Sequence, residues 1–366
     1  MKKKVLSLLL AATMVLGLTA CGSAKTDKDS GNSDTDKSGK YELALITDVG
    51  TIDDKSFNQG SWEGLVKYAE EHKITHKYYK PAEKSDQACL DAIALAVKGG
   101  AKVIVVPGFL FTNPIGVAQD KYPDVKFVFI DGAPEVDKKV TIGKNVQSIF
   151  FAEEQAGYLA GYAAVKDGYK KLGFMGGIAV PAVVRYGYGF VQGADAAAKE
   201  LNITGVEMNY TYVGNFDATP ENQALAASWF SEGTEVIFGC GGAVGNSVMK
   251  AAEAKKAKVI GVDVDQSPES KTVITSAMKN LGKAVYDAID SVYKDKFEGG
   301  IAANLDASVD GIQLPMETST FKDFSNDDYK ALFEKLVDGS VKVLKDDAAT
   351  SADQLTTTVV KVNVVK

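Results

Sequence analysis

The stretch LALITDVGTIDDKSFNQGSWEGLVKYAEEH, residues 43–72, decides the fold. An apolar run typical of a buried strand, LALIT at 43–47, is followed by a polar loop and then by a helical pattern over 57–72. Similar apolar runs recur as VIVVP at 103–107, FVFID at 127–131, LGFMGG at 172–177, VIFGC at 236–240 and VIGVD at 259–263. Further helices are expected at 85–98, 150–166, 189–200, 220–231, 244–254 and 280–295. Strands that alternate with helices indicate βαβ units, so we expect an α/β protein with parallel sheets.

The length of the chain indicates two lobes. Residues 41–366 are too many for one compact domain of ordinary size. The motif F-x-Q-G occurs at Phe57 and again at Phe190, each time after an apolar run and an expected loop, the second loop being 178–188. We therefore expect each phenylalanine at the start of the first helix of its lobe, and two lobes of similar build.

Polar, aromatic and glycine residues follow several of the strand runs. They are Asp48, Phe109, Asp131, Gly241, Gly242 and Asp263. In open parallel sheets, ligands bind beyond the carboxyl ends of the strands, where loops and helix N-termini converge. We expect a ligand site in a cleft between the two lobes.

Residues 1–20 have the pattern of a bacterial lipoprotein export signal. The charged start MKKK precedes an apolar run at 5–18, and small residues precede Cys21. The apolar run is too short to span a membrane comfortably, which favours cleavage over an uncleaved anchor. We expect Cys21 to become the first residue and to carry acyl chains such as palmitate, which would hold the protein on the extracytoplasmic face of the cell membrane. Residues 22–40, rich in Gly, Ser, Asp and Lys, predict a flexible tether.

The chain is acidic. Its formal net charge is −7, and removal of residues 1–20 takes away three lysines and no acid, which leaves −10. This charge, with no basic cluster, argues against a nucleic-acid partner. Cys89 and Cys240 could pair in an oxidising compartment, but they lie in different halves of the chain and we expect two free thiols that pack as small apolar groups.

The glycine-rich run GCGGAVG, residues 239–245, is similar to a dinucleotide-binding fingerprint, with Asp263 at the position of a ribose acceptor. The run does not open the first βαβ unit, however, and no acid or base for hydride transfer is apparent. Its glycines fit either a tight turn or the close approach of a backbone to a small ligand. We expect no bound cofactor.

Metal and nucleophile motifs are equally weak. Asp48, Asp53 and Asp54 lack the register and the final Glu of a calcium loop. His72 and His76 lack the Glu of a zinc protease motif. No G-x-S-x-G or phosphate-binding loop is present. We expect neither a metal site nor catalysis.

A binding site explains the mixture of residues 48–60. A carboxylate at a strand end can accept two hydrogen bonds from a vicinal diol such as ribose, and a second carboxylate can accept from a ring N–H. Phenyl rings from two lobes can clamp a planar base, and Asn58 can both donate to and accept from a purine edge. Helix capping or a solvated loop would explain any single one of these residues. A sugar ligand, and less readily a nucleoside hydrolase, remain alternatives.

A set of motifs resembles the basic membrane protein family of bacterial lipoproteins. The motifs are TDVGTIDDKSFNQGSWEG at 47–64, IDG at 130–132, GFVQG at 189–193, GCGGAVG at 239–245, GVDVDQ at 261–266 and TSAMKN at 275–280. Within this family the chain is most similar to the purine nucleoside receptor A group, the substrate-binding components of nucleoside ABC importers. The similarity extends from residue 41 to about residue 315, and the C-terminal segment matches no motif.

This resemblance implies a type I periplasmic-binding-protein fold, in which three crossovers join two Rossmann-like lobes. The N-terminal lobe would contain 41–145 and about 275–310, and the C-terminal lobe 146–274 and about 311–366. A monomer of this kind captures guanosine, inosine or adenosine in the cleft and delivers it to the permease subunits of an ABC transporter.

The resemblance also implies roles for individual residues. Phe57 and Phe216 would stack on the base. Asn58 and Asp131 would contact the edge of the base, and Asp48 would lie close by. The ribose hydroxyls would be held by Asp263, Lys279 and the backbone of Gly241 and Gly242. Phe190 is added to this set because of the repeated F-x-Q-G motif.

Overall fold

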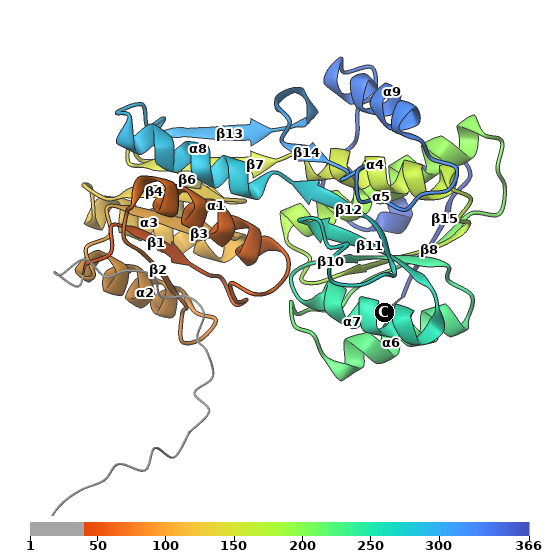
Figure 1. Cartoon of the computed structure of the whole chain (residues 1–366), viewed down its shortest axis with the longest axis horizontal. Helices are drawn as coiled ribbons and strands as arrows, with labels where there is room; N and C mark the ends of the chain where they lie inside the picture. Colours follow the sequence, from red (N-terminus) through yellow and green to blue (C-terminus); the bar gives the residue numbers. More distant parts are fainter. Residues whose placement is uncertain (1–39, 366) are drawn as a thin grey trace, which may run out of the picture. The chain divides into compact units, whose positions relative to one another are not determined.

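The computed structural model describes residues 40–365. The predicted export signal, the lipidated Cys21 and the tether before residue 40 lie outside the described residues. The described chain is organised around a six-stranded and a seven-stranded sheet, both drawn in Figure 1.

The first sheet is parallel throughout. Its strands are β1 (Leu43–Ile46), β2 (His76–Tyr79), β3 (Val103–Pro107), β4 (Lys126–Ile130), β7 (Val146–Phe151) and β13 (Ile301–Leu305). The helices packed on it are α1 (Phe57–His72), α2 (Asp86–Lys98), α3 (Thr112–Lys121) and α8 (Leu281–Tyr293). Two short strands, β5 (Glu135–Val136) and β6 (Lys139–Val140), form a separate antiparallel hairpin.

The second sheet is parallel except for one short strand at its edge, β14, which is antiparallel to β12. Its strands are β8 (Lys171–Gly176), β9 (Glu207–Tyr212), β10 (Val236–Cys240), β11 (Lys258–Asp263), β12 (Val273–Lys279), β14 (Ile312–Gln313) and β15 (Lys361–Val364). The helices of this half are α4 (Glu153–Lys166), α5 (Pro181–Glu200), α6 (Pro220–Ser231), α7 (Val244–Lys255) and α9 (Asn326–Val337).

The two sheets have the same strand order, and they differ in the direction of the sixth strand, which is parallel in the first sheet and antiparallel in the second. The strand order is β2-β1-β3-β4-β7-β13 in the first and β9-β8-β10-β11-β12-β14 in the second, with β15 added outside β9. The chain passes between the sheets after β7, after β12 and after β13. The expected α/β class, the parallel sheets and the three crossovers are therefore confirmed.

Alternation of side chains along the strands explains why helices cover both faces of each sheet. In β1, Leu43 and Leu45 pack in one apolar cluster with Leu65 of α1, whereas Ala44 and Ile46 pack in another with Ile93 of α2. All four strand residues are fully buried. Figure 1 shows α1 and α8 on one side of this sheet and α2 on the other. A two-residue period with both faces apolar produces this three-layer arrangement.

The predicted elements agree with the structure except around α5. Helices at 57–72 and 220–231 are confirmed, and the helices expected at 85–98, 244–254 and 280–295 differ by two residues or fewer at each end. The helix expected from residue 150 begins at Glu153, because β7 continues to Phe151. The segment 178–188, predicted as a loop, contains the first two turns of α5, which begins at Pro181.

The expected equivalence of Phe57 and Phe190 was therefore wrong. Phe57 is the first residue of α1, but Phe190 lies in the middle of α5. The lobes share their strand order, yet the two F-x-Q-G motifs do not occupy matching places.

Two strands do not follow the predicted lobe boundaries. β7 begins just after residue 145, the predicted end of the first part of the N-terminal lobe, but it pairs in the first sheet. β12 continues past residue 274, where the C-terminal lobe was predicted to pause, and stays in the second sheet. The division of the chain into two lobes with given residue ranges stays a prediction.

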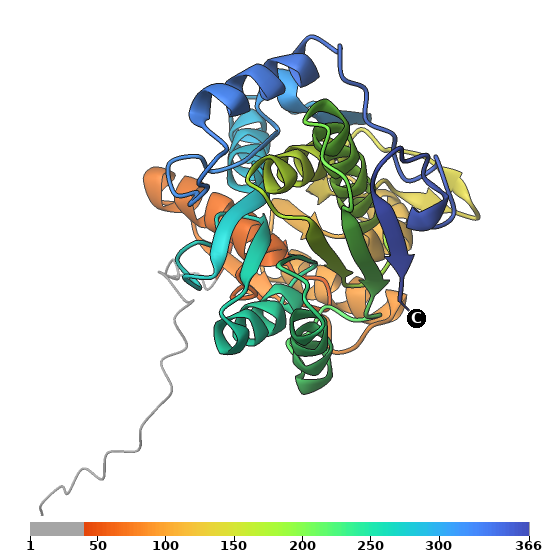
Figure 2. The ribbon, with the colours of Figure 1, turned by 90° about the vertical axis from the view of Figure 1, so that its right-hand side faces the viewer.

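The C-terminal segment belongs to the second half of the fold. Helix α9 packs on α4, and β15 pairs in parallel with β9 at the sheet edge, as Figure 2 shows. The carboxylate of Asp195 accepts hydrogen bonds from the backbone N–H groups of Thr358, Val359 and Val360 at 2.7–2.9 Å. These bonds align the segment that leads into β15.

A close contact between α1 and α8 gives a test of this packing. A Cβ at Gly64 would lie 2.4 Å from the carbonyl oxygen of Gly282, whereas a Cβ at Gly282 would have its nearest neighbour at 3.6 Å. We expect Gly64→Ala to lower the free energy of unfolding by about 1–3 kcal/mol, because the helices must separate. Gly282→Ala is the matched control and should leave stability unchanged or raise it by up to about 1 kcal/mol, because alanine is the better helix former. Urea denaturation measures both, and equal stabilities of the two variants would contradict the contact.

Candidate functional site

A cavity lies at the carboxyl ends of the strands of both sheets. Its volume, counted as the space open to the centre of a water molecule, is about 150 Å³. Residues after β1, β3 and β4 line it from the first half of the fold. From the second half it is lined by residues after β9 and β10, by the ends of β11 and β12 and by the start of α5. Its position is the one predicted from the strand ends.

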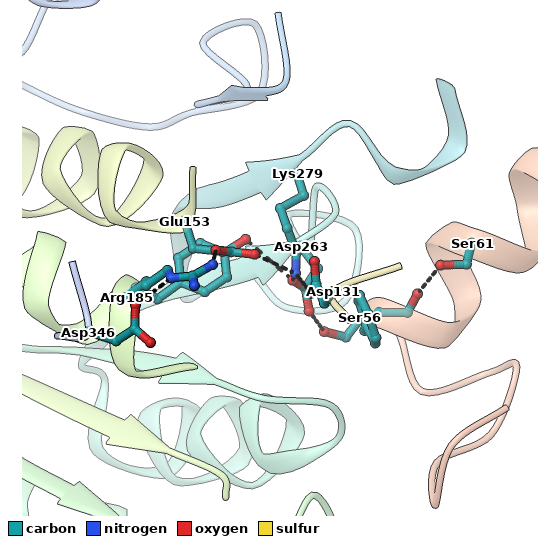
Figure 3. Close-up of polar contacts among 10 residues, drawn as sticks. Ser56, Ser61, Asp131, Glu153, Arg185, Asp263, Lys279 and Asp346 are labelled. Carbon is teal, nitrogen blue, oxygen red and sulfur yellow. Dashed lines mark hydrogen bonds and ion pairs between the residues drawn. The ribbon is translucent and has the colours of Figure 1, made fainter. Parts of the chain in front are cut away.

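A buried lysine occupies one wall of the cavity. The Nζ atom of Lys279 forms an ion pair with Asp131 Oδ2 and lies 3.5 Å from Glu153 Oε1 and 3.6 Å from Asp263 Oδ1 (Figure 3). All four side chains are buried. Burial alone would lower the pKa of Lys279, but the three carboxylates outweigh that effect and raise the pKa. The lysine is therefore a permanent cation.

Asp131 and Asp263 adopt left-handed backbone conformations, with φ of 58° and 66°. Aspartate tolerates this region better than most residues because its short polar side chain can bond locally. Asp131 Oδ1 is buried and has no hydrogen-bond partner in the described chain. A buried carboxylate oxygen without a donor costs free energy, so this atom is a candidate acceptor for a ligand N–H or O–H group.

Asp263 is held from two sides. Ser56 Oγ, in the loop before α1, donates to Asp263 Oδ2 at 2.6 Å, and Tyr186 on α5 donates to Oδ1 at 3.3 Å. Burial raises the pKa of Asp263, and the ammonium of Lys279 opposes this rise. The bond from Ser56 joins a loop of the first half of the fold to a strand end of the second.

The loop between β1 and α1 is organised by the amide of Asn58. Its Nδ2 atom donates to Asp48 Oδ1 and to Asp54 Oδ2, at 2.9 Å each, and its Oδ1 accepts from the backbone N–H of Asp48 at 3.3 Å. Asp54 also accepts from the backbone N–H groups of Ser56 and Asn58, which makes its carboxylate the cap of α1. Burial raises the pKa of Asp48, and it raises the pKa of Asp54 to about 6.

Both donors of the Asn58 amide are thus used within the protein. The purine contact predicted for Asn58 is limited to the second lone pair of Oδ1 unless the loop rearranges. The bonds of Asp54 to the backbone at the start of α1 account for this acid without a ligand, although the residue also borders the cavity.

Phe57 and Phe216 reach the cavity from opposite halves of the fold. Three glycines make room for Phe216: a Cβ would lie 2.3 Å from its ring at Gly177 and 3.1 Å at Gly241, and 3.1 Å from its carbonyl oxygen at Gly242. Gly241 and Gly242 also have positive φ, 127° and 52°. The glycine-rich run therefore places an aromatic ring against the backbone.

A family model described as ABC transporter substrate-binding protein PnrA-like, Bmp, matches residues 41–347. The chain belongs to this Bmp family. It is 29% identical over 344 residues to the ABC transporter nucleoside-binding protein BmpA of Lactococcus lactis subsp. cremoris (strain MG1363), covering 87% of this chain and 93% of that protein. An uncharacterized lipoprotein of Pyrococcus abyssi (strain GE5 / Orsay) is 29% identical over 276 residues, which are 72% of this chain and 66% of that protein.

A solved solute-binding protein of an ABC transporter system from Aeropyrum pernix K1 has the same fold. It superposes with a TM-score of 0.74 at 25% sequence identity and covers 86% of this chain and 95% of that chain. The periplasmic-binding-protein fold and the family predicted from the motifs are confirmed. As a Bmp protein, the chain is the substrate-binding component of an ABC transporter.

The structure brings together all but one of the residues predicted for the site. The cavity is lined by Asp48, Phe57, Asn58, Asp131, Phe216, Gly241, Gly242, Asp263 and Lys279. Phe190 is fully buried in the core, where it packs edge-on against Phe238, and it does not line the cavity.

Several residues around the site were not predicted. Tyr186 and Lys80 line the cavity, Ser56 holds Asp263, and Glu153 pairs with Lys279. Tyr186 lies in the segment predicted as a loop. Phe109, expected at a strand end, lines the cavity as well.

Other expected features have the following outcomes. Cys89 and Cys240 are buried free thiols, as expected. Among residues 40–365 no group of three or more His, Cys, Asp or Glu residues could hold a metal ion. No helix in the described part of the chain is long and apolar enough to cross a membrane.

The buried lysine gives a second test. We expect Lys279→Met to lower the free energy of unfolding by about 3–5 kcal/mol, because it leaves buried carboxylates without their shared cation. Lys283→Met is the control, since Lys283 pairs with Asp287 on the exposed face of α8, and it should change stability by less than about 1 kcal/mol. Thermal or urea unfolding measures both. Similar losses in the two variants would contradict a stabilising role of the buried cluster.

Proposed function

We propose that this Bmp protein is an extracytoplasmic receptor for purine nucleosides such as guanosine, inosine and adenosine, and that it delivers them to the permease of an ABC importer without chemical change. The observation that carries the proposal is the unpartnered Asp131 Oδ1 in a cavity that Phe57 and Phe216 line from opposite halves. A purine offers flat faces for the rings and N–H groups for the carboxylate. The nucleoside-binding name of the Lactococcus lactis relative supports the same ligand class.

In this proposal the base lies between Phe57 and Phe216. Asp131 Oδ1 accepts a hydrogen bond from the base, and Asp48 lies near the same edge. Asn58 acts mainly by holding the carboxylate of Asp48 in place, because both of its amide donors are already used. Aromatic stacking tolerates different bases, so the carboxylates supply the discrimination.

The ribose then lies toward the second half of the fold. Asp263 accepts hydrogen bonds from the vicinal hydroxyls, and Lys279 donates to a ribose oxygen. Gly241 and Gly242, just before α7, also line the cavity and would offer their backbone to the ribose. A sugar lacks the planar base for which the two rings are suited.

Ligand binding by such a protein favours a closed arrangement of the lobes. Contacts from both lobes are available to the ligand only when the cleft is closed, so the ligand shifts the population toward the closed form by its higher affinity for that form. The hydrogen bond from Ser56 to Asp263 also links the two sides of the cleft and favours the closed form.

The proposed location is the outer face of the cell membrane, where acyl chains on Cys21 would anchor a monomer. Support comes from the export-signal pattern of residues 1–20 and from the relative in Pyrococcus abyssi that is called a lipoprotein. The acidic net charge is consistent with a small-molecule ligand and with no nucleic-acid partner.

Calorimetry with nucleosides, free bases and sugars tests the ligand class. We expect guanosine, inosine or adenosine to bind, and the 2′-deoxynucleosides to bind more weakly by about 1–3 kcal/mol, because a buried acceptor loses its donor. Phe216→Ala should weaken binding about 5- to 150-fold, which corresponds to about 1–3 kcal/mol of stacking. Phe333→Ala is the control, because Phe333 is a partly buried ring outside the cavity.

Two results would reject this proposal. Binding of sugars alone would remove the stacking of a base. Release of free base from inosine at a rate that depends on protein concentration would indicate a hydrolase instead of a receptor.

The anchor is tested separately from the ligand. We expect the full-length protein, expressed in a bacterium, to sediment with membranes and to incorporate labelled palmitate, and Cys21→Ser to abolish both properties. Cys89→Ser is the control and should leave both unchanged. Membrane association of Cys21→Ser equal to that of the parent protein would reject lipidation at this residue.

A further inference from the structure

Glu153 lies where the chain crosses from one half of the fold to the other. It is the first residue of α4 and is separated from β7 of the first sheet by Ala152. Lys279 lies at a second crossover, as the last residue of β12, and α8 begins two residues later against α1. Two buried side chains of opposite charge therefore connect two of the three crossovers.

Glu153 contacts a cation on each side. Its Oε1 atom lies 3.5 Å from Lys279 Nζ, and its Oε2 atom lies 3.5 Å from Nη1 of Arg185 on α5. Nε of Arg185 in turn donates to Asp346 Oδ1 at 2.7 Å, so the row of charges in Figure 3 continues into the C-terminal segment. Glu153 is fully buried and does not line the cavity. Of the residues that line the cavity, Lys279 is the one with which Glu153 forms an ion pair.

The ammonium of Lys279 is shared between Glu153 and the two aspartates of the cavity wall. Hydroxyl and N–H groups of a ligand would donate to the same two aspartates. Attraction by Glu153 draws the ammonium away from them and leaves their oxygens available. We propose that Glu153, itself held by Arg185, is a positioning residue that sets the place of Lys279 for nucleoside binding, an inference that rests on the proposed function.

The charge of Glu153 depends on pH. The titratable or charged groups whose charges act on or respond to Glu153 are Asp131, Lys279, Arg185, Glu154, Tyr186 and Cys240. Burial, with the negative charge of Asp131 next, raises the pKa of Glu153 to about 8. As the pH falls through this value, Glu153 takes up a proton and loses its attraction for Lys279. The ammonium then moves onto the aspartates, and the affinity for the nucleoside falls.

Adenosine binding by wild type and by Glu153→Gln, measured by calorimetry from pH 6 to 9.5, tests the inference, because adenosine, unlike guanosine or inosine, loses no ring N–H proton in this range. We expect wild-type affinity to rise with pH around a midpoint near 8. We expect Glu153→Gln to bind at least about tenfold more weakly than wild type at pH 9, and to show no such rise, because the neutral amide mimics the protonated acid.

The neighbouring Glu154 provides the matched control. It is as deeply buried as Glu153 and pairs with Lys345 of the C-terminal segment at 3.5 Å, but it has no contact with Lys279. We expect Glu154→Gln to keep the affinity at pH 9 within about twofold and to keep the rise of affinity with pH, with its midpoint moved to lower pH because the negative charge of Glu154 no longer raises the pKa of Glu153. A purely structural role of Glu153 would give similar changes in both variants and would overturn the inference.

The remaining outcomes are also decisive. Equal affinity and an equal pH profile of Glu153→Gln and wild type would overturn this inference alone. No nucleoside binding by wild type would refute the proposed function, and this inference with it. If Glu153→Gln does not fold, Asp346→Asn replaces it, because Asp346 is partly exposed. Loss of Asp346 frees Arg185 for Glu153 and should move the midpoint to lower pH, and an unmoved midpoint would overturn the inference.

Discussion

The buried ammonium of Lys279 is the interaction on which the site depends. Its three carboxylate partners come from the end of β4, the end of β11 and the start of α4. A buried charge without a partner is costly, so the lysine requires these acids, and Asp131 and Asp263 depend on the lysine, whereas Glu153 also pairs with Arg185. The lysine has all three partners only where the first sheet, the second sheet and a crossover meet. The cavity forms beside that point.

The site follows from the repeated strand order of the two sheets, with one difference between them at the end of the fifth strand. β4 and β11 occupy equivalent places in their sheets, and each is followed by or ends in an aspartate with positive φ, Asp131 and Asp263. β7 and β12 are also equivalent, but β12 ends in Lys279 whereas β7 ends in Phe151, whose ring centroid lies 5.6 Å from the lysine Nζ. Two equivalent aspartates thus face one cation, and at the place equivalent to Lys279 the first sheet has an apolar ring, Phe151.

Local patterns in the sequence were sufficient for the strand runs and for the position of the site, because β-branched runs and the residues after them are local features. Strand β2, HKYY, was not predicted because it lacks an apolar run. It lies at the edge of the sheet and is only partly buried, so it does not require one. Pro181 was predicted to lie in a loop, although proline is favoured in the first turn of a helix and is the first residue of α5. Glu153 could not be found from sequence, since its partner Lys279 is 126 residues away.

The position of β15 late in the sequence has a further consequence. The outer strand β13 of the first sheet comes from residues 301–305, and β15, which covers β9 in the second sheet, comes from residues 361–364. Both sheets therefore need segments from late in the sequence, and β9 presents unpaired N–H and C=O groups until residues 361–364 pair with it. A chain cut before residue 361 would leave β9 as the exposed edge of the second sheet, where it could pair with strands of other chains, whereas β15 covers β9 and becomes the edge itself.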